Sequence, residues 1–391
     1  MKDELLLTFN AGSSTVKIGI FARGNVGARR IGKGMIDFRK PPLTFHLTEG
    51  PKTFDVPLEA SDEEDLREVL TEVFGCLADH FDLDSVSAAG HRVVHGGDVF
   101  TGPAKIDDNV IDGIQALVAL APLHQPQSLR LITALRHLKP SLVQTVSFDT
   151  AFHRTNGDLV RRFAIPRAMH DEGIKRYGFH GLSYKFIAGA LASRKPDISQ
   201  RKVVIAHLGS GASLCGIENG VSRDTSMGFS TLDGIPMATR CGALDPGVLL
   251  HLLSEKQQSP GMVENLLYHQ SGLLGVSGIS ADSRELLADG RPEAGEALDL
   301  FAFRIAGETA RIANTLGGID AVVFTAGIGE HQPEIRTRVA RHLAWLGVEL
   351  DAAANARNDE TISTTQSRVA VLVVPTDEEQ TIVDEALSVI G

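Results

Sequence analysis

The sequence has few cysteines, no long apolar run and no cluster of basic residues. Its three cysteines, Cys76, Cys215 and Cys241, are scattered and form no CxxC pair. This argues against a disulfide framework or a zinc site and is consistent with a reducing compartment. No stretch approaches the ~18 apolar residues that a membrane helix requires. The charged start, residues 1–4, is followed by too short an apolar stretch for a signal peptide. We therefore expect a soluble, cytoplasmic protein.

Charge and composition exclude other classes. The chain has 38 basic and 49 acidic residues, a net charge of −11, so no nucleic-acid partner is expected. Hydrophobic residues make up 43% of 391 residues, which indicates a folded globular protein with one large domain or two. An acidic protein that handles phosphate must concentrate its positive charge locally.

Two common nucleotide-binding motifs are absent. No GxxxxGK[ST] occurs, which excludes a P-loop enzyme, and no GxGxxG occurs, which disfavours a Rossmann dehydrogenase. Apolar strands lead instead into turns of small residues, at 10–15, 209–213 and 327–329. Backbone N–H groups in such turns can approach an anion closely. Three of these turns together predict a nucleotide site, with the helix after 327–329 presenting its N-terminus to the phosphates.

The two halves of the chain resemble each other. Asn10 aligned on His207 without gaps gives four identities in eleven positions, and both segments are strand–turn–strand units. Residues 85–97 and 319–330 are each a β-branched strand ending in a glycine-rich turn. We interpret this as an internal duplication, with two α/β lobes whose related loops face a shared cleft. The predicted N-terminal lobe spans 1–149 plus 380–391, and the C-terminal lobe spans 150–379.

Several polar side chains stand in apolar or small-residue surroundings. Asp149 ends an apolar strand, where a catalytic or Mg²⁺ role outweighs that of a helix N-cap. Arg240 lies in the long charge-poor segment 225–247 and is a candidate for binding an anion. Glu378 follows a buried strand and is either a Mg²⁺ ligand or part of an acidic first helical turn.

Three histidines are open to more than one interpretation. His91 and His95 have a spacing that allows a metal pair, although ordinary hydrogen-bonded histidines beside a turn are favoured. His180, in KRYGFHGLSY, is a buried turn residue or a functional one, and the local sequence does not decide.

These residues belong to a set of motifs that resembles the acetate/propionate kinase family along nearly the whole chain. The motifs are NAGSSTVK, GHRVVHGG, APLHQP, FDTAFH, RYGFHG, HLGSGAS, TSMGFSTLDG, SGLLGVSGIS, FTAGIGE and PTDEE. The resemblance implies two duplicated ribonuclease H-like (actin-like ATPase) lobes with a nucleotide cleft between them. It further implies reversible phosphoryl transfer from ATP to acetate, giving acetyl phosphate and ADP, with Mg²⁺ or Mn²⁺ as cofactor, in a homodimer.

The resemblance also implies roles for individual residues. Arg92, Asp149, His180 and Arg240 would be catalytic, with His180 and Arg240 stabilising the transition state and His124 assisting. Asn10 and Glu378 would hold the metal. The small acyl pocket would be formed by Arg92, Val93, Leu123, Phe179 and Thr231. The nucleotide would contact Lys17, His207, Gly209, Ser210, Gly211, Asp282, Ser283, Arg284, Gly327, Ile328, Gly329 and Glu330.

Some positions depart from the family pattern. Ser210 stands where the family has asparagine, Tyr184 where it has histidine, and Thr231 where it has a pocket proline. Because Thr231 changes the volume and polarity of the pocket, propionate or another short acid is an alternative substrate. A non-catalytic actin-like nucleotide switch is an alternative of another class, although Arg92, His180 and Arg240 speak against it. A sugar kinase is a further alternative. It would need a base to activate a hydroxyl group and a polar sugar pocket, whereas the pocket inferred here is small and apolar.

Overall fold

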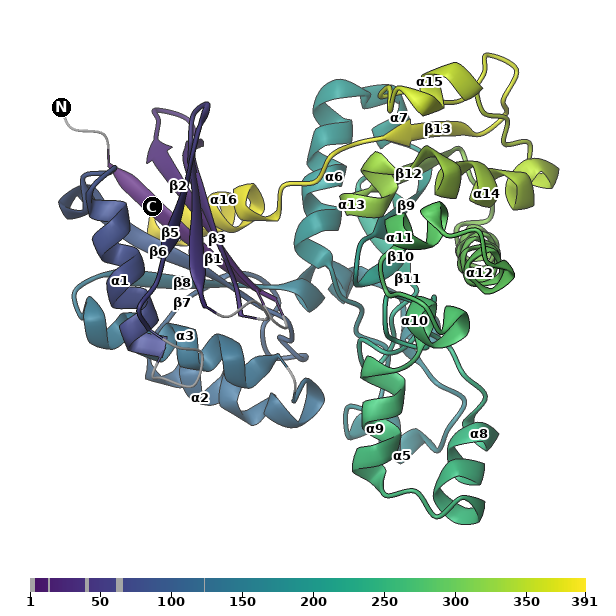
Figure 1. Cartoon of the computed structure of the whole chain (residues 1–391), viewed down its shortest axis with the longest axis horizontal. Helices are drawn as coiled ribbons and strands as arrows, with labels where there is room; N and C mark the ends of the chain where they lie inside the picture. Colours follow the sequence, from purple (N-terminus) through teal and green to yellow (C-terminus); the bar gives the residue numbers. More distant parts are fainter. Residues whose placement is uncertain (1–3, 13–14, 39–41, 61–65, 123) are drawn as a thin grey trace. The chain divides into compact units, whose positions relative to one another are not determined.

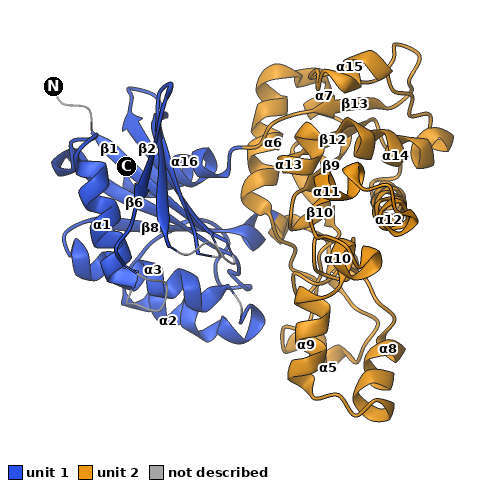
Figure 2. Ribbon diagram, viewed as in Figure 1, with its two compact units in different colours: residues 1–152, 377–391 blue, residues 153–376 orange. Residues whose placement is uncertain are grey.

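The computed structural model describes residues 4–12, 15–38, 42–60, 66–122 and 124–391 (Figure 1). The chain forms two compact units, unit 1 with residues 1–152 and 377–391 and unit 2 with residues 153–376 (Figure 2). The predicted lobe boundaries lie within three residues of this division. That the units act as separate lobes around a cleft stays a prediction. No helix among the described residues is long and apolar enough to cross a membrane.

Unit 1 contains a sheet in the order β5-β4-β3-β2-β1-β6-β8-β7. Its strands are β1 (Leu5–Ala11), β2 (Thr15–Arg23), β3 (Ala28–Asp37), β4 (Thr44–Glu49), β5 (Lys52–Pro57), β6 (Val86–Val93), β7 (Ala104–Lys105) and β8 (Val143–Phe148). Its helices are α1 (Leu66–Ala78), α2 (Asp108–Ala116), α3 (Gln125–Leu138) and α16 (Glu378–Ile390).

Both faces of this sheet are covered, so β1 is buried along its whole length. Successive side chains of a strand point to opposite faces. Leu5 and Leu7 pack in one cluster with buried residues of α1 and α3, whereas Leu6 packs with Val383 of α16. The stretch at 5–9, apolar except for Thr8, is explained by this double burial.

Unit 2 contains a second sheet in the order β11-β10-β9-β12-β13. Its strands are β9 (Lys202–Leu208), β10 (Ala212–Glu218), β11 (Val221–Thr225), β12 (Ala321–Thr325) and β13 (Ala370–Val373). Its helices are α4 (Asp158–Arg161), α5 (Arg167–Asp171), α6 (Gly181–Arg194), α7 (Pro196–Ser199), α8 (Pro246–Leu250), α9 (Pro260–His269), α10 (Gly272–Ser277), α11 (Ser283–Ala288), α12 (Pro292–Leu316), α13 (Ala326–His331), α14 (Pro333–Leu343) and α15 (Ala352–Ala356).

The two sheets share one topology, which confirms the predicted duplication. In unit 1 the order β3-β2-β1-β6-β8 has antiparallel pairs up to β1 and parallel pairs after it. In unit 2 the order β11-β10-β9-β12-β13 has the same sequence of antiparallel and parallel pairs. The two aligned segments are the β1–β2 and β9–β10 hairpins, and the second pair of similar segments contains β6 and β12.

One local prediction is wrong. Gly327, Ile328 and Gly329 do not form a turn between a strand and a helix, because they lie inside the short helix α13. The second helix, α14, then begins at Pro333. Proline fits a first helical position because its missing N–H has no partner to lose there.

Candidate active site

In unit 1, candidate residues gather where three neighbouring strands end. β1, β6 and β8 run parallel, so their carboxyl ends lie at one edge of the sheet. Asn10 lies near the end of β1, Arg92 near the end of β6, and Asp149 directly after β8. Glu378 opens α16, whose first turn reaches the same edge and contacts Asn10. Ligands in α/β sheets bind at such an edge.

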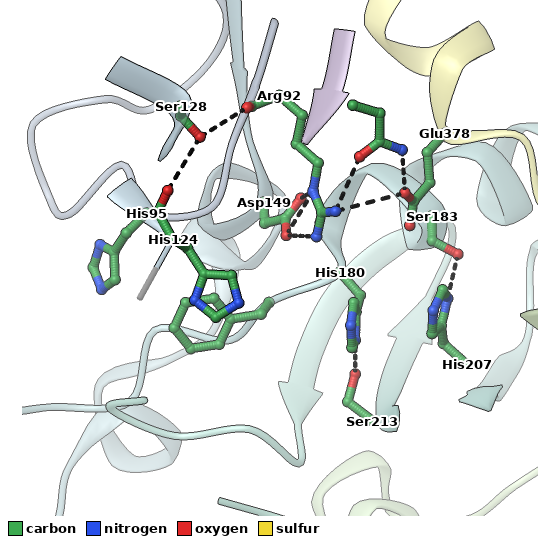
Figure 3. A network of polar contacts seen from close by, with 12 residues as sticks. Arg92, His95, His124, Ser128, Asp149, His180, Ser183, His207, Ser213 and Glu378 are labelled. Atoms are coloured by element: carbon green, nitrogen blue, oxygen red, sulfur yellow. Dashed lines mark hydrogen bonds and ion pairs between the residues drawn. The ribbon is translucent and has the colours of Figure 1, made fainter. Parts of the chain in front are cut away.

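Arg92 is the centre of this group (Figure 3). Its Nε and Nη2 donate to the two carboxylate oxygens of Asp149 at 3.0 and 2.6 Å, and its Nη1 donates to Asn10 Oδ1 at 3.0 Å. Glu378 Oε2 lies 3.9 Å from Nη1. Burial opposes the charge on Arg92, but the Asp149 and Glu378 carboxylates outweigh it and raise the pKa of the guanidinium. Arg92 therefore stays charged, and its guanidinium group is held in place by the hydrogen bonds to Asp149.

The same edge carries the oxygen donors predicted for a metal. Asn10 Nδ2 donates to Glu378 Oε2 and to Glu379 Oε1, both at 2.8 Å. Within the described part of the chain, no group of three or more His, Cys, Asp or Glu side chains is placed to hold a metal ion. Mg²⁺ is commonly held by one or two carboxylates, with waters and substrate phosphates completing the shell. Glu378 fits that pattern, whereas Asp149 and Asn10 fit it less well because their side-chain oxygens already accept from Arg92.

The other unit 1 candidates lie in different environments. Val93 is fully buried in the core beneath α2 and α3. Lys17 is exposed on β2 opposite Asn10. His124 precedes α3, and Ser128 Oγ lies 3.4 Å from the carbonyl oxygens of both His124 and Arg92. Leu123, predicted to line the acyl pocket, lies outside the described residues.

The two histidines of GHRVVHGG are both hydrogen-bonded, as favoured. His91 Nε2 lies 2.8 Å from Gln144 Oε1, and the ring stacks on Phe9. His95 Nδ1 accepts from the Gly97 N–H at 2.9 Å. Desolvation by burial lowers the pKa of each imidazole to about 4, so both rings are neutral at physiological pH.

In unit 2, His180 stands at the head of α6 in a left-handed backbone conformation, with φ 56° and ψ 25°. Such a conformation is uncommon for residues other than glycine and is held by its surroundings. The preceding carbonyl, that of Phe179, accepts from His153 Nε2 at 2.9 Å. At Gly178 a Cβ atom would lie 2.5 Å from Thr225 Cγ2 and 2.6 Å from His153 Cδ2. The turn before His180 is thus fixed by close packing and a hydrogen bond.

The His180 ring is held by polar neighbours. Its Nδ1 lies 2.7 Å from Ser213 Oγ, and its ring stacks on that of His207 at a centroid distance of 4.3 Å (Figure 3). His207 Nδ1 lies 2.8 Å from Ser183 Oγ on α6. The antiparallel register of β9 and β10 places His207 directly opposite Ser213, so both side chains share one face of the sheet.

Gly211 lies beside His180 and Arg240. A Cβ atom at this position would lie 3.4 Å from His180 Nε2 and 3.8 Å from Arg240 Nη1, so both nitrogens converge on this glycine. Arg240 Nη1 also donates to the Thr231 carbonyl at 3.3 Å, and the Thr231 side chain is buried. Two side-chain nitrogens from different segments beside one glycine suit an oxyanion such as a phosphoryl group or a carboxylate.

Two groups of predicted nucleotide residues in unit 2, at 207–211 and 327–330, lie at the carboxyl ends of β9 and β12, which are neighbouring parallel strands. A Cβ atom on Gly209 would lie 3.9 Å from Ala326 Cβ, which brings the 209–211 turn next to α13. Ser283, at the start of α11, accepts from Gln332 Nε2 at 2.8 Å, so α11 meets the end of α13. Ser210 is exposed beside them.

Two of the predicted nucleotide residues also bond to other residues of the chain. Glu330 Oε1 accepts from the backbone N–H groups of Ala326 and Thr376, at 2.7 and 3.1 Å. Arg284 is 79% exposed and pairs with Asp282, which caps α11. Glu330 therefore links the start of α13 to the backbone at Thr376, whereas the Arg284 side chain is exposed to solvent.

Sequence reasoning missed several residues that hold the candidates in place. They are Tyr184, Ser213, His153, Gln332 and Arg336. Arg336 is fully buried and donates from Nη1 to the Gly329 carbonyl at 2.8 Å. Tyr184 was signalled by its departure from the family pattern, whereas Ser213, His153 and Gln332 act through partners distant in sequence.

Known proteins resemble this chain over its whole length. The model of the acetokinase family matches residues 5–384. Acetate kinase of Rhodopseudomonas palustris (strain TIE-1) is 46% identical over 389 residues, covering 96% of each chain. The crystal structure of a propionate kinase from Francisella tularensis has a TM-score of 0.92, is 32% identical, and matches over 99% of this chain and 100% of that one. Porphyromonas gingivalis acetate kinase has a TM-score of 0.89 at 31% identity, over 99% and 100%.

These matches define an enzyme class, the phosphotransferases with a carboxyl group as acceptor. Within that class, the chain belongs to the acetokinase family. The likeness in fold also confirms the predicted actin-like α/β architecture.

Proposed function

We propose that the protein is an acetate kinase, which transfers the γ-phosphoryl group of ATP to acetate and gives acetyl phosphate and ADP reversibly. The convergence of His180 Nε2 and Arg240 Nη1 on Gly211 supports this most directly. These donors suit the equatorial oxygens of a transferring phosphoryl group, where negative charge spreads in the transition state. Acetate as the phosphoryl acceptor is inferred from the acetate kinases among the relatives.

The reaction needs no general base. Acetate is ionised at neutral pH, so a carboxylate oxygen attacks the γ-phosphorus while the bond to the bridging oxygen of ADP breaks, and no proton moves. Asp149 suits this scheme because its oxygens accept from Arg92 and keep that guanidinium in place. We assign Arg92 and Arg240 to binding the anionic reactants, and His180 and Arg240 to stabilising the transition state.

We assign a Mg²⁺ or Mn²⁺ ion to the carboxylates at the strand edge of unit 1, Glu378 first, with Asp149 and Asn10 nearby. Bound there, the ion would supply positive charge to the phosphate oxygens of ATP. We assign the adenosine end of ATP to the 327–330 segment with Asp282 and Ser283, because Gln332 links α11 to the end of α13.

The test is a hydroxamate-trapping assay with ATP and Mg²⁺, in which acyl phosphate is captured by hydroxylamine. We expect acetate-dependent product, and we expect Arg240→Ala to lower kcat by roughly 10²–10³-fold, as removal of one such donor commonly does. Arg341→Ala, at an exposed position of α14, is the matched control. An Arg240→Ala variant with normal turnover would contradict the assignment.

Propionate is a second candidate substrate. Thr231 replaces the pocket proline of the family pattern, and the propionate kinase from Francisella tularensis has a closely similar fold. Burial raises the pKa of Tyr268, and a hydrogen bond to Thr231 and the charge of Arg240 oppose the rise, which places these three side chains together. We expect Thr231→Pro to change the acetate-to-propionate ratio of kcat/KM. One methylene is worth about 10–200-fold in such a pocket.

We further propose that the protein works as a homodimer in the cytoplasm. Large apolar side chains are exposed on and beside α8 and α9, among them Leu250 and Met262, which suits contact with a second copy. The free cysteines suit a reducing compartment. Sedimentation velocity would measure the mass of the assembly.

A further inference from the structure

His180 belongs to a chain of three polar groups that is wholly contained in unit 2. Ser213 Oγ lies 2.7 Å from His180 Nδ1, and the Tyr184 hydroxyl lies 2.5 Å from the same Ser213 Oγ. Tyr184 and Ser213 are both fully buried, whereas His180 is half-buried at the head of α6. Tyr184 follows His180 by one helical turn, so α6 itself positions the phenol below the ring.

Proton counting allows two directions for the hydrogen bonds in this chain, and the relative acidity of the two hydroxyls favours one of them. Each hydroxyl has one proton to donate. A phenol is more acidic than an aliphatic hydroxyl and is the better donor, so Tyr184 donates to Ser213 Oγ. The Ser213 proton is then directed to His180 Nδ1, which accepts it. A neutral imidazole that accepts at Nδ1 carries its proton on Nε2.

We propose that Tyr184 and Ser213 are positioning residues that hold His180 as the neutral Nε2–H tautomer, with that N–H aimed at the space beside Gly211. This inference rests on the proposed function and deepens it, because it concerns how the same site presents a donor to the phosphoryl group. Tyr184 stands where the family pattern has histidine, so its phenol departs from that pattern.

The other groups around His180 agree with a neutral ring. Arg240 Nη1 lies near the same glycine as His180 Nε2, and a nearby cation disfavours a positive charge on the imidazole. His207 stacks on the ring at 4.3 Å, and its own Nδ1 is engaged by Ser183. A neutral ring with a fixed N–H adds a hydrogen bond to the transition state without repelling Arg240.

The experiment combines kinetics with nitrogen-15 NMR of the histidine side chains in the full-length protein. In the wild type, the His180 signals, assigned by their loss in His180→Gln, should show the Nε2–H tautomer. Ser213→Ala should populate both tautomers and lower kcat about 10-fold, less than the ~10²–10³-fold cost of losing a donor outright. KM for ATP and acetate should stay within about 2-fold, because binding contacts are unchanged.

The Tyr184→Phe variant removes one hydroxyl and keeps the buried ring. It should lower kcat about 3-fold alone and have no further effect in a Ser213→Ala background, because the phenol acts only through the serine. Tyr177→Phe is the matched control, since the buried Tyr177 hydroxyl donates to the Gly173 carbonyl at 2.9 Å and should leave kcat unchanged.

Three results would overturn the inference: an Nδ1–H tautomer in the wild type, an unchanged tautomer in Ser213→Ala, or independent effects of the two substitutions. If Ser213→Ala does not fold, Tyr184→Phe with its NMR spectrum still decides, because the second tautomer should appear there too. The NMR measurement uses the resting protein, so failure of the kinase proposal, with no acyl phosphate formed, remains distinguishable from failure of the tautomer assignment.

Discussion

Replacing Arg336 by methionine should destabilise unit 2 strongly. The fully buried guanidinium donates to Asn355 Oδ1 at 2.7 Å, to the Asn355 carbonyl and the Gly329 carbonyl at 2.8 Å each, and to Asn358 Oδ1 at 2.6 Å. All of these acceptors are neutral. Desolvation by burial lowers the pKa of Arg336 to about 10, with the more distant Glu334 carboxylate acting against it.

The size of the expected change in the free energy of unfolding depends on the acceptors that lose a hydrogen bond. Methionine fits a similar volume and removes the cost of burying a charge, which is several kcal/mol. It also leaves the buried acceptors on Gly329 and Asn355 without these bonds, at about 1–3 kcal/mol for each, whereas the exposed Asn358 can bond to water instead. Part of this cost is relieved by relaxation of the 355–358 segment. We expect a net loss of about 3–5 kcal/mol in the free energy of unfolding, a large effect of the kind that loss of a buried hydrogen-bond network causes.

Urea unfolding followed by fluorescence of Trp345 would measure this loss, because the only tryptophan of the chain lies just after α14 in unit 2. Arg341→Met, an exposed substitution on the same helix, should change the free energy of unfolding by no more than about 0.5 kcal/mol. A loss below about 1 kcal/mol in Arg336→Met would refute the reasoning, since it would mean that the bonds only balance the cost of burying the charge.

Gly211→Ala should lower kcat/KM by about 10–100-fold in the hydroxamate assay, because the added methyl group would lie 3.4 Å from His180 Nε2 where the phosphoryl group is proposed to bind; unchanged kinetics would move the phosphoryl site elsewhere. Burial lowers the pKa of His153 to about 4, below the ~6.5 of an unfolded chain, so the unfolded state binds more protons and stability falls as pH falls from 6.5 to 4. His153→Gln should reduce the slope of unfolding free energy against pH by about 1.4 kcal/mol per pH unit in that window. An unaltered slope would exclude His153 as a cause of this pH dependence. Glu378→Gln should raise the Mg²⁺ concentration needed for half-maximal rate about 10–100-fold, and an unshifted Mg²⁺ titration would remove Glu378 from the metal site.

Much of the architecture is readable from the sequence because its causes are local. Alternating or continuous apolar residues define the strands, and turns of small residues mark where each hairpin reverses, which is why the duplication was visible at 10–20 and 207–217. Asp149 was expected at a strand end, and it is there. The glycines at 327–329 misled the turn prediction, because the backbone of Ala326, at φ 65°, makes the sharp bend and lets a helix begin at once.

The tertiary structure alone decided how the candidate residues are held. Asn10 meets Glu378 across 368 positions of sequence, Glu330 meets Thr376 across 46, and Tyr184 meets Ser213 across 29. A sequence shows which side chains can donate or accept a proton, but the tautomer of His180 and the partners of Arg92 depend on which groups packing brings within about 3 Å. The sequence therefore determines the chemical type of each side chain, whereas the orientation and protonation state of that side chain depend on neighbours that only the folded chain provides.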